Sequence, residues 1–239
     1  MEVVPVLEVD VSKSFNGKKV IDRIRFKAEE GSFVCILGES GCGKTTLLRI
    51  IAGLESFEGT IKYRGREIDR EKIGFVFQDD RLIPWRTALE NVTFPLELRG
   101  IEDAERALKA LEMVGLKGYE SYYPKHLSGG MRQRIGIARA LVINPEILLM
   151  DEPFASLDEL TRAKMQMELL RIWMENRVTI LFVTHSIEEA VFLADKVVVL
   201  SRKPSRVAGE VFIDLKRPRN RTDQRFNEYR KELMRLLIA

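Results

Sequence analysis

Cysteine and long hydrophobic runs are scarce in this chain. Its two cysteines, Cys35 and Cys42, stand too close in the sequence for a disulfide framework and match no metal-binding spacing, so both are expected to be reduced thiols. Apolar runs such as 34–37, 147–150 and 197–200 have the length of strands, whereas a membrane-spanning helix needs about 20 apolar residues. The chain does not open with the basic and apolar segments of a signal peptide. A role at a membrane would therefore depend on a partner protein.

A strong bias of charge is also absent. The net charge is only +3 over 239 residues, and such a balance predicts no nucleic-acid partner. Hydrophobic residues make up 45% of the chain, which is enough to build a core. The length fits one large domain, or a core that carries one inserted subdomain.

The order of the expected elements favours an α/β fold. Residues 3–37 have the pattern of short strands, and Asn16-Gly17 is a pair typical of a hairpin turn. Helical periodicity dominates residues 88–144. Later strands are expected at 147–150, 179–184 and 196–200, and helices at 44–52, 160–176 and 221–238. We therefore predict a mixed, largely parallel sheet, an N-terminal antiparallel β portion and an inserted α-helical subdomain.

The clearest motif is a glycine-rich loop from Gly38 to Thr45 that fits G-x-x-x-x-G-K-[ST]. Its glycines let successive backbone N–H groups turn toward phosphate oxygens, and the helix that starts at Lys44 adds its positive dipole end. Lys44 is expected to reach the β- and γ-phosphates of a nucleotide, and Thr45 to bind Mg²⁺. The predicted nucleotide contacts here are Gly38, Glu39, Ser40, Gly41, Cys42, Gly43, Lys44, Thr45 and Thr46.

This loop alone leaves the class of protein open. A structural glycine-rich turn is the plain alternative, and GTPases and small-molecule kinases share the same loop. The strand before it and the helix after it indicate a P-loop NTPase core. We assign residues 1–87 and 145–215 to this nucleotide-binding core, 88–144 to a helical subdomain and 216–239 to a C-terminal helical tail.

Two carboxylates follow the apolar run 147–150. In a parallel sheet, Asp151 and Glu152 would stand at the carboxyl end of a buried strand, where α/β folds bind ligands. Asp151 can hold Mg²⁺ through water and Glu152 can polarise the attacking water, a division that suits phosphoryl transfer. The alternative is a strand that ends in an ordinary acidic turn.

A second anion-binding helix start is expected at Leu127–Met131, which reads Leu-Ser-Gly-Gly-Met. Ser128 is a natural N-cap, and Gly129 and Gly130 leave the first N–H groups of the helix open to an anion. An ordinary capped helix is the alternative. Two phosphate-binding helix starts in one chain favour a second contact with a γ-phosphate.

Taken in order, these motifs resemble the ATP-binding cassette family, of which the Leu-Ser-Gly-Gly signature is diagnostic. The motifs that carry the resemblance are 38–45, Gln78, 127–131, Asp151-Glu152, 156–158 and His185. The resemblance covers nearly the whole chain. It implies an ATPase with ATP and Mg²⁺ as cofactors. One departure is Met131, where the commonest family signature has glutamine.

The resemblance also implies roles for single residues. His185 resembles the switch histidine that contacts the γ-phosphate, although a lone histidine at a strand end is more often structural. Gln78 resembles the residue that senses Mg²⁺ and links the nucleotide to a membrane partner, and Asp158 the residue that couples two sites. Phe15 matches the aromatic that stacks on adenine, with a core aromatic as the alternative.

In the family, two cassettes join head to tail, so that Ser128 and Gly129 serve the ATP held by Lys44 of a second copy. The implied partners are that second copy, a membrane permease and, indirectly, a substrate-binding protein. The implied location is the cytoplasmic face of the membrane, as a peripheral subunit.

Three classes of protein carry such a phosphate loop: an importer ATPase, a soluble cassette protein not engaged in transport, and a P-loop kinase or GTPase. The signature and the absence of an Asn-Lys-x-Asp motif argue against the last class. The Leu-x-Pro-Trp stretch at Leu82–Trp85 with the downstream Asn91 resembles importers of the nitrate, sulfonate and taurine group, which includes pyrimidine and thiamine-precursor importers. Trp85 is predicted to meet the membrane partner, or else only to pack the subdomain.

Overall fold

The computed structural model describes residues 5–238. By their internal contacts these residues form two compact units, one made of 5–70 with 177–238 and the other of 71–176. The predicted helical insert 88–144 lies inside the second unit, which extends beyond it in sequence on both sides. The boundaries 88 and 144 stay a prediction.

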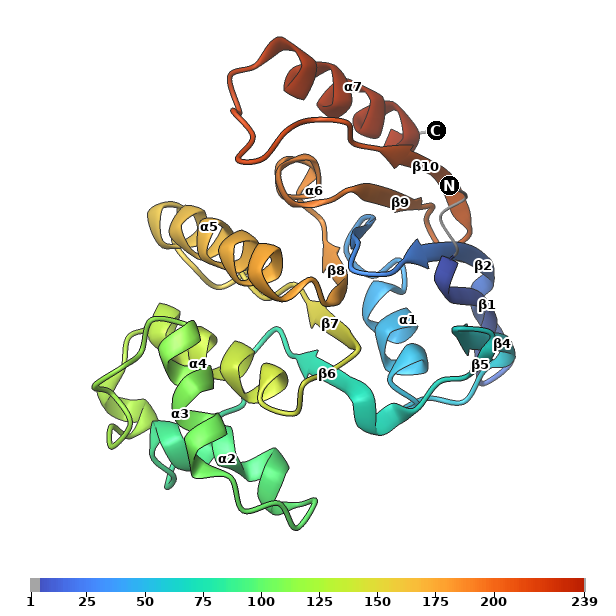
Figure 1. Ribbon diagram of the computed structural model, residues 1–239. Helices are drawn as coiled ribbons and strands as arrows, with labels where there is room; N and C mark the ends of the chain where they lie inside the picture. Colours follow the sequence, from blue (N-terminus) through green and yellow to red (C-terminus); the bar gives the residue numbers. More distant parts are fainter. Residues whose placement is uncertain (1–4, 239) are drawn as a thin grey trace. The chain divides into compact units, whose positions relative to one another are not determined.

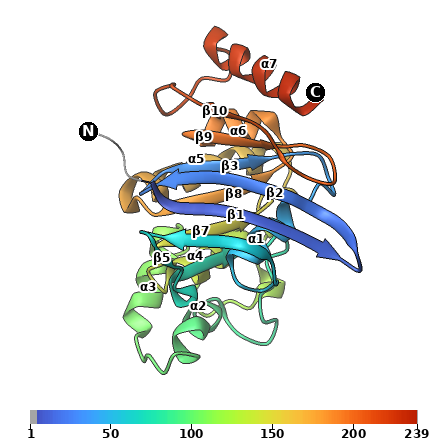
Figure 2. The same ribbon diagram turned by 90° about the vertical axis from the view of Figure 1, so that its right-hand side faces the viewer.

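The first unit opens with a long β-hairpin. β1 (Pro5–Phe15) and β2 (Lys18–Glu29) pair antiparallel and run side by side in Figure 2. Between them Asn16 and Gly17 both have positive φ, 48° and 75°, which gives a two-residue turn whose twist matches that of the strands. The predicted hairpin is confirmed. β4 (Glu58–Tyr63) pairs antiparallel with β1, and the short β5 (Arg66–Glu67) pairs with β4.

The parallel strands of this unit are built around β3 (Phe33–Leu37). It pairs in parallel with β8 (Thr179–Thr184) and with β9 (Lys196–Leu200), and all three strands are buried along their whole length. Such continuous apolar strands are typical of a parallel sheet covered on its faces by helices. β10 (Val207–Phe212) adds an antiparallel strand beside β9. The predicted α/β class, with a mixed sheet, is confirmed.

Three helices belong to the first unit: α1 (Lys44–Ile51), α6 (Ile187–Leu193) and α7 (Gln224–Ile238), all visible in Figure 1. α7 packs against α6, β9 and β10 through the buried side chains of Phe226 and Leu233. The buried Arg219 fastens the segment before α7, because its guanidinium donates to the carbonyl oxygens of four residues. These are Val191, Ala194, Ile213 and Leu215. Burial lowers the pKa of Arg219 to about 10.

The second unit combines a parallel strand pair with four α-helices. β6 (Ile73–Val76) pairs with β7 (Ile147–Asp151). α2 (Ala88–Glu97), α3 (Ala104–Met113) and α4 (Gly129–Leu141) pack on one another, and α5 (Glu159–Asn176) follows β7 in the chain. Short 3-10 turns lie at Arg70–Lys72, where the two units meet in sequence, and at Pro124–His126. Across residues 5–238, no helix is long and apolar enough to span a membrane.

Candidate functional site

The glycine-rich loop follows β3 and leads into α1, as the sequence predicts. Gly41 and Gly43 have φ of 79° and 111°, a left-handed backbone that side chains disfavour. Gly43 is the residue directly before the first turn of α1. The loop therefore leads into the start of a helix, where backbone N–H groups and the helix dipole favour an anion, as in a phosphate-binding loop. Within the loop, the Cys42 N–H donates to the Glu39 carbonyl at 3.2 Å.

Lys44 lies across this loop. Its side chain is 4% exposed, and its Nζ donates to the carbonyl oxygens of Gly38 at 2.8 Å and Glu39 at 2.9 Å. The ammonium group is thus held inside the loop. A phosphate oxygen can replace these carbonyls as the acceptor of its hydrogen bonds. Thr45 and Thr46 stand half-buried in the first turn of α1, beside this charge.

Cys42 points into the protein rather than outward from the loop. Its side chain is 3% exposed, and its Sγ lies where a side chain on Gly38 would have to go. Burial raises the pKa of the Cys42 thiol, although the charge of Lys44 acts in the opposite direction. The predicted contact of Cys42 with a nucleotide would therefore involve its backbone rather than its buried side chain.

His185 follows the last residue of β8 and is exposed. A buried network holds the residues on either side of it. The Thr184 hydroxyl donates to Glu189 Oε2 at 2.5 Å and accepts from the backbone N–H of Ser186 at 3.0 Å. Ser186 in turn caps α6 by accepting from the Glu189 N–H at 3.3 Å. The backbone at His185 is therefore fixed on both sides while its ring faces outward.

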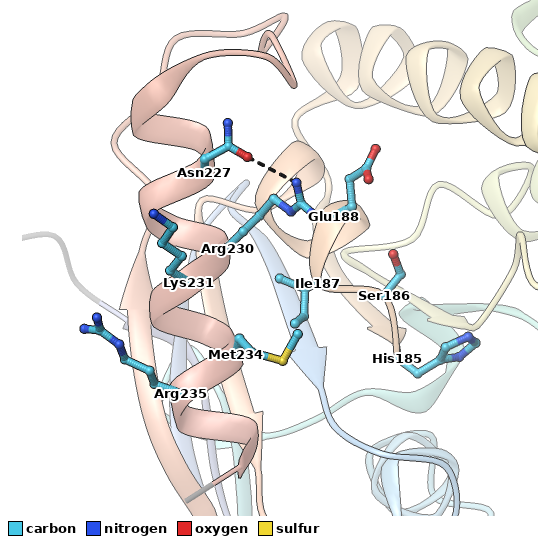
Figure 3. Close-up of a pocket in the computed structure, with 9 residues that line it drawn as sticks. All are labelled: His185, Ser186, Ile187, Glu188, Asn227, Arg230, Lys231, Met234 and Arg235. Atoms are coloured by element: carbon cyan, nitrogen blue, oxygen red, sulfur yellow. Dashed lines mark hydrogen bonds between the residues drawn. The ribbon is translucent and has the colours of Figure 1, made fainter.

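A hollow of about 650 Å³ begins at His185 and runs between α6 and α7. In Figure 3, Ile187 and Met234 face each other in its middle, and Arg230 reaches toward Asn227. His185 and Ser186 lie at the end nearest β8. His185 is thus one of the residues that line this hollow.

Phe15 ends β1 at the hairpin turn and is 40% exposed. The Nζ of Lys13 lies 4.5 Å from the centroid of its ring. Lys13 itself is buried and paired with Glu55 and Ser56. The structure therefore presents Phe15 as an exposed aromatic at the edge of the unit, and its predicted adenine contact stays a prediction.

In the second unit, the two predicted acids stand at the end of β7. Asp151 is its last residue and is buried, whereas Glu152 is half-exposed. Glu152 has φ of 42°, a left-handed conformation that costs free energy in a residue with a side chain and is concentrated at functional sites. The chain thus turns sharply directly after the strand, between a buried and a half-exposed acid.

The signature residues form the start of α4, which begins at Gly129, within the predicted segment Leu127–Met131. Ser128 caps the helix by accepting from the Met131 N–H at 3.3 Å. Gly129 and Gly130 occupy the first helical turn, where backbone N–H groups lack partners within the helix. Ser128 is exposed, so its hydroxyl proton and these N–H groups can meet an anion.

Gln78 is exposed just after β6, and the chain that follows it is tied to α4. Arg132 Nε donates to Asp80 Oδ2 at 2.8 Å while its Nη1 donates to the Leu127 carbonyl at 2.7 Å. Arg139 donates to the carbonyls of Asp80 and Arg81, both at 2.8 Å. A conformational change in the segment after Gln78 would therefore shift the start of the signature helix α4.

The predicted site residues are thus divided between the units. Those in the first unit are Phe15, the loop 38–46 and His185; those in the second are Gln78, 128–130, Asp151, Glu152 and Asp158. Sequence reasoning missed Thr184 and Glu189, which hold the histidine segment. A polar pair five residues apart at a strand–helix junction is the signal that could have found them.

Comparison with known proteins agrees with this geometry. Residues 21–155 match the family model described as ABC transporter. An ABC transporter ATP-binding protein of Methanocaldococcus jannaschii is 53% identical over 93% of this chain and 86% of its own length. The aliphatic sulfonates import ATP-binding protein SsuB of Bacillus cereus is 44% identical over 93% of this chain and 90% of its own.

Among solved structures, a dimeric ATP-binding cassette bound to ADP and phosphate in a post-hydrolysis state is 33% identical. It superposes with a TM-score of 0.72, over 88% of this chain and 100% of its own. In this chain the phosphate loop follows β3, the acidic pair stands at the end of β7, and the signature residues start α4. The chain therefore belongs to the ABC transporter family, and it is an ATP-binding cassette ATPase.

Proposed function

We propose that this ATPase drives an importer by docking on a separate membrane permease through the loop around Trp85. The observation that carries the proposal is a tryptophan that is 77% exposed on an immobilised loop. Tryptophan is enriched among the residues that dominate interfaces, so an exposed Trp on a fixed loop suits a docking role.

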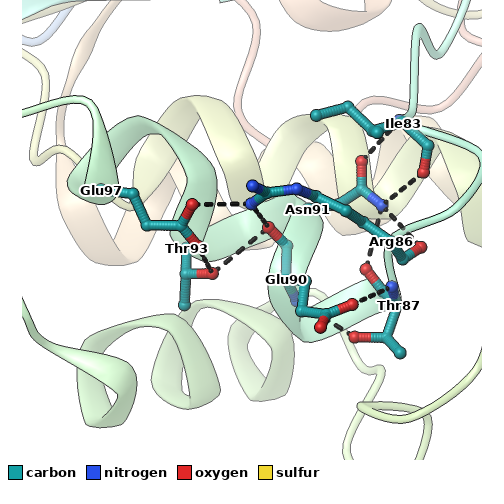
Figure 4. A network of polar contacts seen from close by, with 7 residues as sticks. All are labelled: Ile83, Arg86, Thr87, Glu90, Asn91, Thr93 and Glu97. Carbon is teal, nitrogen blue, oxygen red and sulfur yellow. Dashed lines mark hydrogen bonds and ion pairs between the residues drawn. The ribbon is translucent and has the colours of Figure 1, made fainter.

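The loop is held by Asn91, which is completely buried in α2. Figure 4 draws its contacts: its Oδ1 accepts from the Ile83 N–H at 2.7 Å, and its Nδ2 lies within hydrogen-bonding distance of three carbonyls. These belong to Ile83, Arg86 and Thr87. Because the backbone on both sides of Trp85 is fixed in advance, binding a partner would cost little conformational entropy.

A reciprocal cap extends this support. The Thr87 hydroxyl accepts from the Glu90 N–H at 3.2 Å, and the Glu90 carboxylate accepts from the Thr87 N–H at 2.6 Å. This contact lowers the pKa of Glu90. Arg86, next to Trp85, pairs with Glu97 at 2.7 Å. Trp85 is thus exposed beside polar groups of Arg86, Thr87, Glu90 and Asn91 that are paired with one another or with neighbouring residues.

At the nucleotide, we assign Lys44 and the loop N–H groups to the β- and γ-phosphates, and Phe15 to adenine. Mg²⁺ is assigned to Thr45, Gln78 and Asp151, the catalytic carboxylate to Glu152, and the γ-phosphate switch to His185. Among residues 5–238, no group of three His, Cys, Asp or Glu side chains could hold a metal by itself. Mg²⁺ is proposed to arrive with the phosphates of ATP, as is usual for this ion.

The transported molecule is proposed to be an aliphatic sulfonate, on the similarity to the SsuB protein. The ATPase would sit on the cytoplasmic face of the membrane, with a substrate-binding protein as an indirect partner. A cassette that works outside transport is the competing function, and it would have no use for an exposed Trp85.

The test is growth on an aliphatic sulfonate as the sole sulfur source, in the parent organism deleted for this gene. Wild-type chain should restore growth and sulfonate uptake, and Trp85→Ala should restore less than about a tenth of that uptake, since truncating a central interface anchor costs at least ~2 kcal/mol. The purified Trp85→Ala chain should keep its own ATPase rate.

Leu54→Ala is the matched control, because Leu54 is also an exposed large apolar residue, at 61%. It should leave uptake at the wild-type level. Uptake that is normal in Trp85→Ala would make Trp85 a packing residue and remove the main support for the permease contact. Growth of the deletion strain itself would exclude the sulfonate as the substrate.

A further inference from the structure

The turn Ser201–Arg206, which joins β9 to β10, lies against the outside of the phosphate loop. Ser205 is completely buried there, and its hydroxyl donates to the Cys42 carbonyl, with the Val20 carbonyl at 3.2 Å as a second acceptor. The backbone of Ser205 is anchored as well: its N–H donates to the Val20 carbonyl at 2.9 Å, and its carbonyl accepts from the Asp22 N–H at 2.8 Å. A fixed hydroxyl from a distant part of the chain therefore touches the loop.

This contact bears on the direction of one loop N–H group. The C=O and N–H of a peptide unit are coplanar and point in opposite directions. The carbonyl of Cys42 and the N–H of Gly43 belong to the same peptide unit. When Ser205 holds that carbonyl outward, the Gly43 N–H is aimed inward, toward the space that the loop encloses. The left-handed Gly43 would otherwise leave this peptide free to rotate, because glycine adopts either sign of φ.

The same turn supplies a charge to the loop. Arg202 Nε and Nη2 donate to the two oxygens of the Glu39 carboxylate at 2.8 and 2.9 Å. This pairing lowers the pKa of Glu39, which is therefore ionised at neutral pH. A carboxylate on a loop that binds phosphates repels them, and a paired guanidinium cancels that repulsion.

We propose that the turn Ser201–Arg206 is the outer support of the phosphate loop: Ser205 orients the Cys42–Gly43 peptide for phosphate, and Arg202 neutralises Glu39. Both are positioning residues that set the affinity for nucleotide. The proposal rests on the assignment of the loop to nucleotide phosphates.

The first test measures MgADP binding to the purified chain by calorimetry, well below the melting temperature. Ser205→Ala keeps the size of the side chain nearly unchanged and removes the donor, so affinity should fall roughly tenfold, the scale of one lost hydrogen bond to an oriented group. Ser205→Thr, which restores a hydroxyl, should recover part of that loss. Ser32→Ala is the control, because the Ser32 hydroxyl also donates to a backbone carbonyl, that of Glu29, at 2.7 Å.

A purely structural Ser205 would lower the melting temperature of the nucleotide-free chain and leave the affinity of the folded chain as in Ser32→Ala. That result would overturn the role of Ser205. In Lys44→Ala, MgADP affinity should be lost outright. If Lys44→Ala binds MgADP with wild-type affinity, the assignment of the loop to nucleotide phosphates is refuted. If Lys44→Ala loses MgADP binding while Ser205→Ala binds MgADP normally, only the proposed role of Ser205 is refuted.

The second test is a double-mutant cycle that does not depend on Ser205. Arg202→Ala should weaken MgADP roughly fivefold at low salt, and this loss should vanish in a Glu39→Gln background, where no charge needs neutralising. Arg25→Ala is the control, since Arg25 forms an exposed ion pair with Asp10 at 2.7 Å elsewhere in the unit. If Arg202→Ala lowers the MgADP affinity equally in the wild-type chain and in Glu39→Gln, Arg202 does not act by neutralising Glu39. Arg202 would then act on the nucleotide directly.

Discussion

Lys44 offers the simplest test of the nucleotide site at the scale of one residue. Its ammonium group is buried against two loop carbonyls, so the loop is charged before any ligand arrives. Lys44→Ala should cut nucleotide affinity or turnover by at least ~100-fold, the scale of losing one preorganised charge contact. ATP hydrolysis and nucleotide binding measure this directly, and circular dichroism checks the fold. Near-normal ATPase activity would refute the assignment.

The thiols of Cys42 and Cys35 differ in pKa, and alkylation rates measure this difference. The thiolate is the reactive form, and burial raises the pKa of the Cys42 thiol and raises that of Cys35 well above its ordinary value. Below its pKa a thiol gains about tenfold in rate per pH unit. Labelling of Cys42 should therefore keep rising where an exposed thiol, with its pKa near ~8.5, levels off. Cys35 should label only on unfolding.

An adduct on Cys42 has to displace Gly38, against which the thiol packs, so ATPase activity should fall as labelling proceeds. MgATP bound beforehand should slow the reaction by fixing the loop. Cys42→Ala should abolish labelling of the native chain and so identify the site. Equal labelling rates with and without MgATP would contradict this placement.

Single residues were predictable from the sequence where the chemistry is local. The phosphate loop, the acids after β7 and the Ser128 cap are each contained in a few consecutive residues, so their pattern indicates their geometry. Ser205 and Arg202 were not predictable, because 163 positions separate each from its partner in the loop. Only the folded sheet, which places β9 beside β3, brings them together.

At the scale of elements, the junction of β8 and α6 fixes the backbone position of His185. Thr184→Val keeps the shape of the side chain but removes both hydrogen bonds of the Thr184 hydroxyl. We expect turnover to fall roughly tenfold, on the scale of general acid–base and γ-phosphate contacts, while the Kd for MgATP stays within about twofold. The unfolding free energy should drop by about 1–3 kcal/mol.

Thr184→Ser, which keeps the hydroxyl, should restore turnover and is the matched control. The split between turnover and Kd is the informative quantity, since a general loss of structure would change both. If Thr184→Val turns over ATP at the wild-type rate, the network serves stability alone and His185 needs no such support.

Most elements were predictable, because their apolar periodicity is strong. The hairpin at Asn16-Gly17, the strands 147–150, 179–184 and 196–200 and the helix near 160–176 were all found within a few residues. α6 was missed because its seven residues are too few to display a period. β10 was missed because its burial alternates weakly and it pairs only at one edge.

At the scale of the whole molecule, the signature helix suggests that one chain is an incomplete enzyme. Ser128 and the N–H groups after it present an anion-binding surface that is exposed in this chain. The related cassette with ADP and phosphate is a dimer. We expect two copies to join head to tail, with each γ-phosphate contacted by Lys44 of one copy and Ser128 of the other. ATP would then stabilise the dimer by mass action, and hydrolysis would release it.

Glu152→Gln isolates this step. Glutamine keeps the shape and hydrogen bonding of Glu152 but removes the charge that polarises water, so the variant should bind ATP, hydrolyse it at least ~100-fold more slowly and accumulate as a dimer. Size-exclusion chromatography with ATP, with ADP and without nucleotide should give a dimer only with ATP. Adding Ser128→Arg should abolish it, because bulk would stand where the phosphate of the second copy must sit. A monomer under all three conditions, with ATP binding confirmed at high protein concentration, would contradict the dimer. If Glu152→Gln hydrolyses ATP at the wild-type rate, Glu152 is not the catalytic residue, and His185 becomes the next candidate.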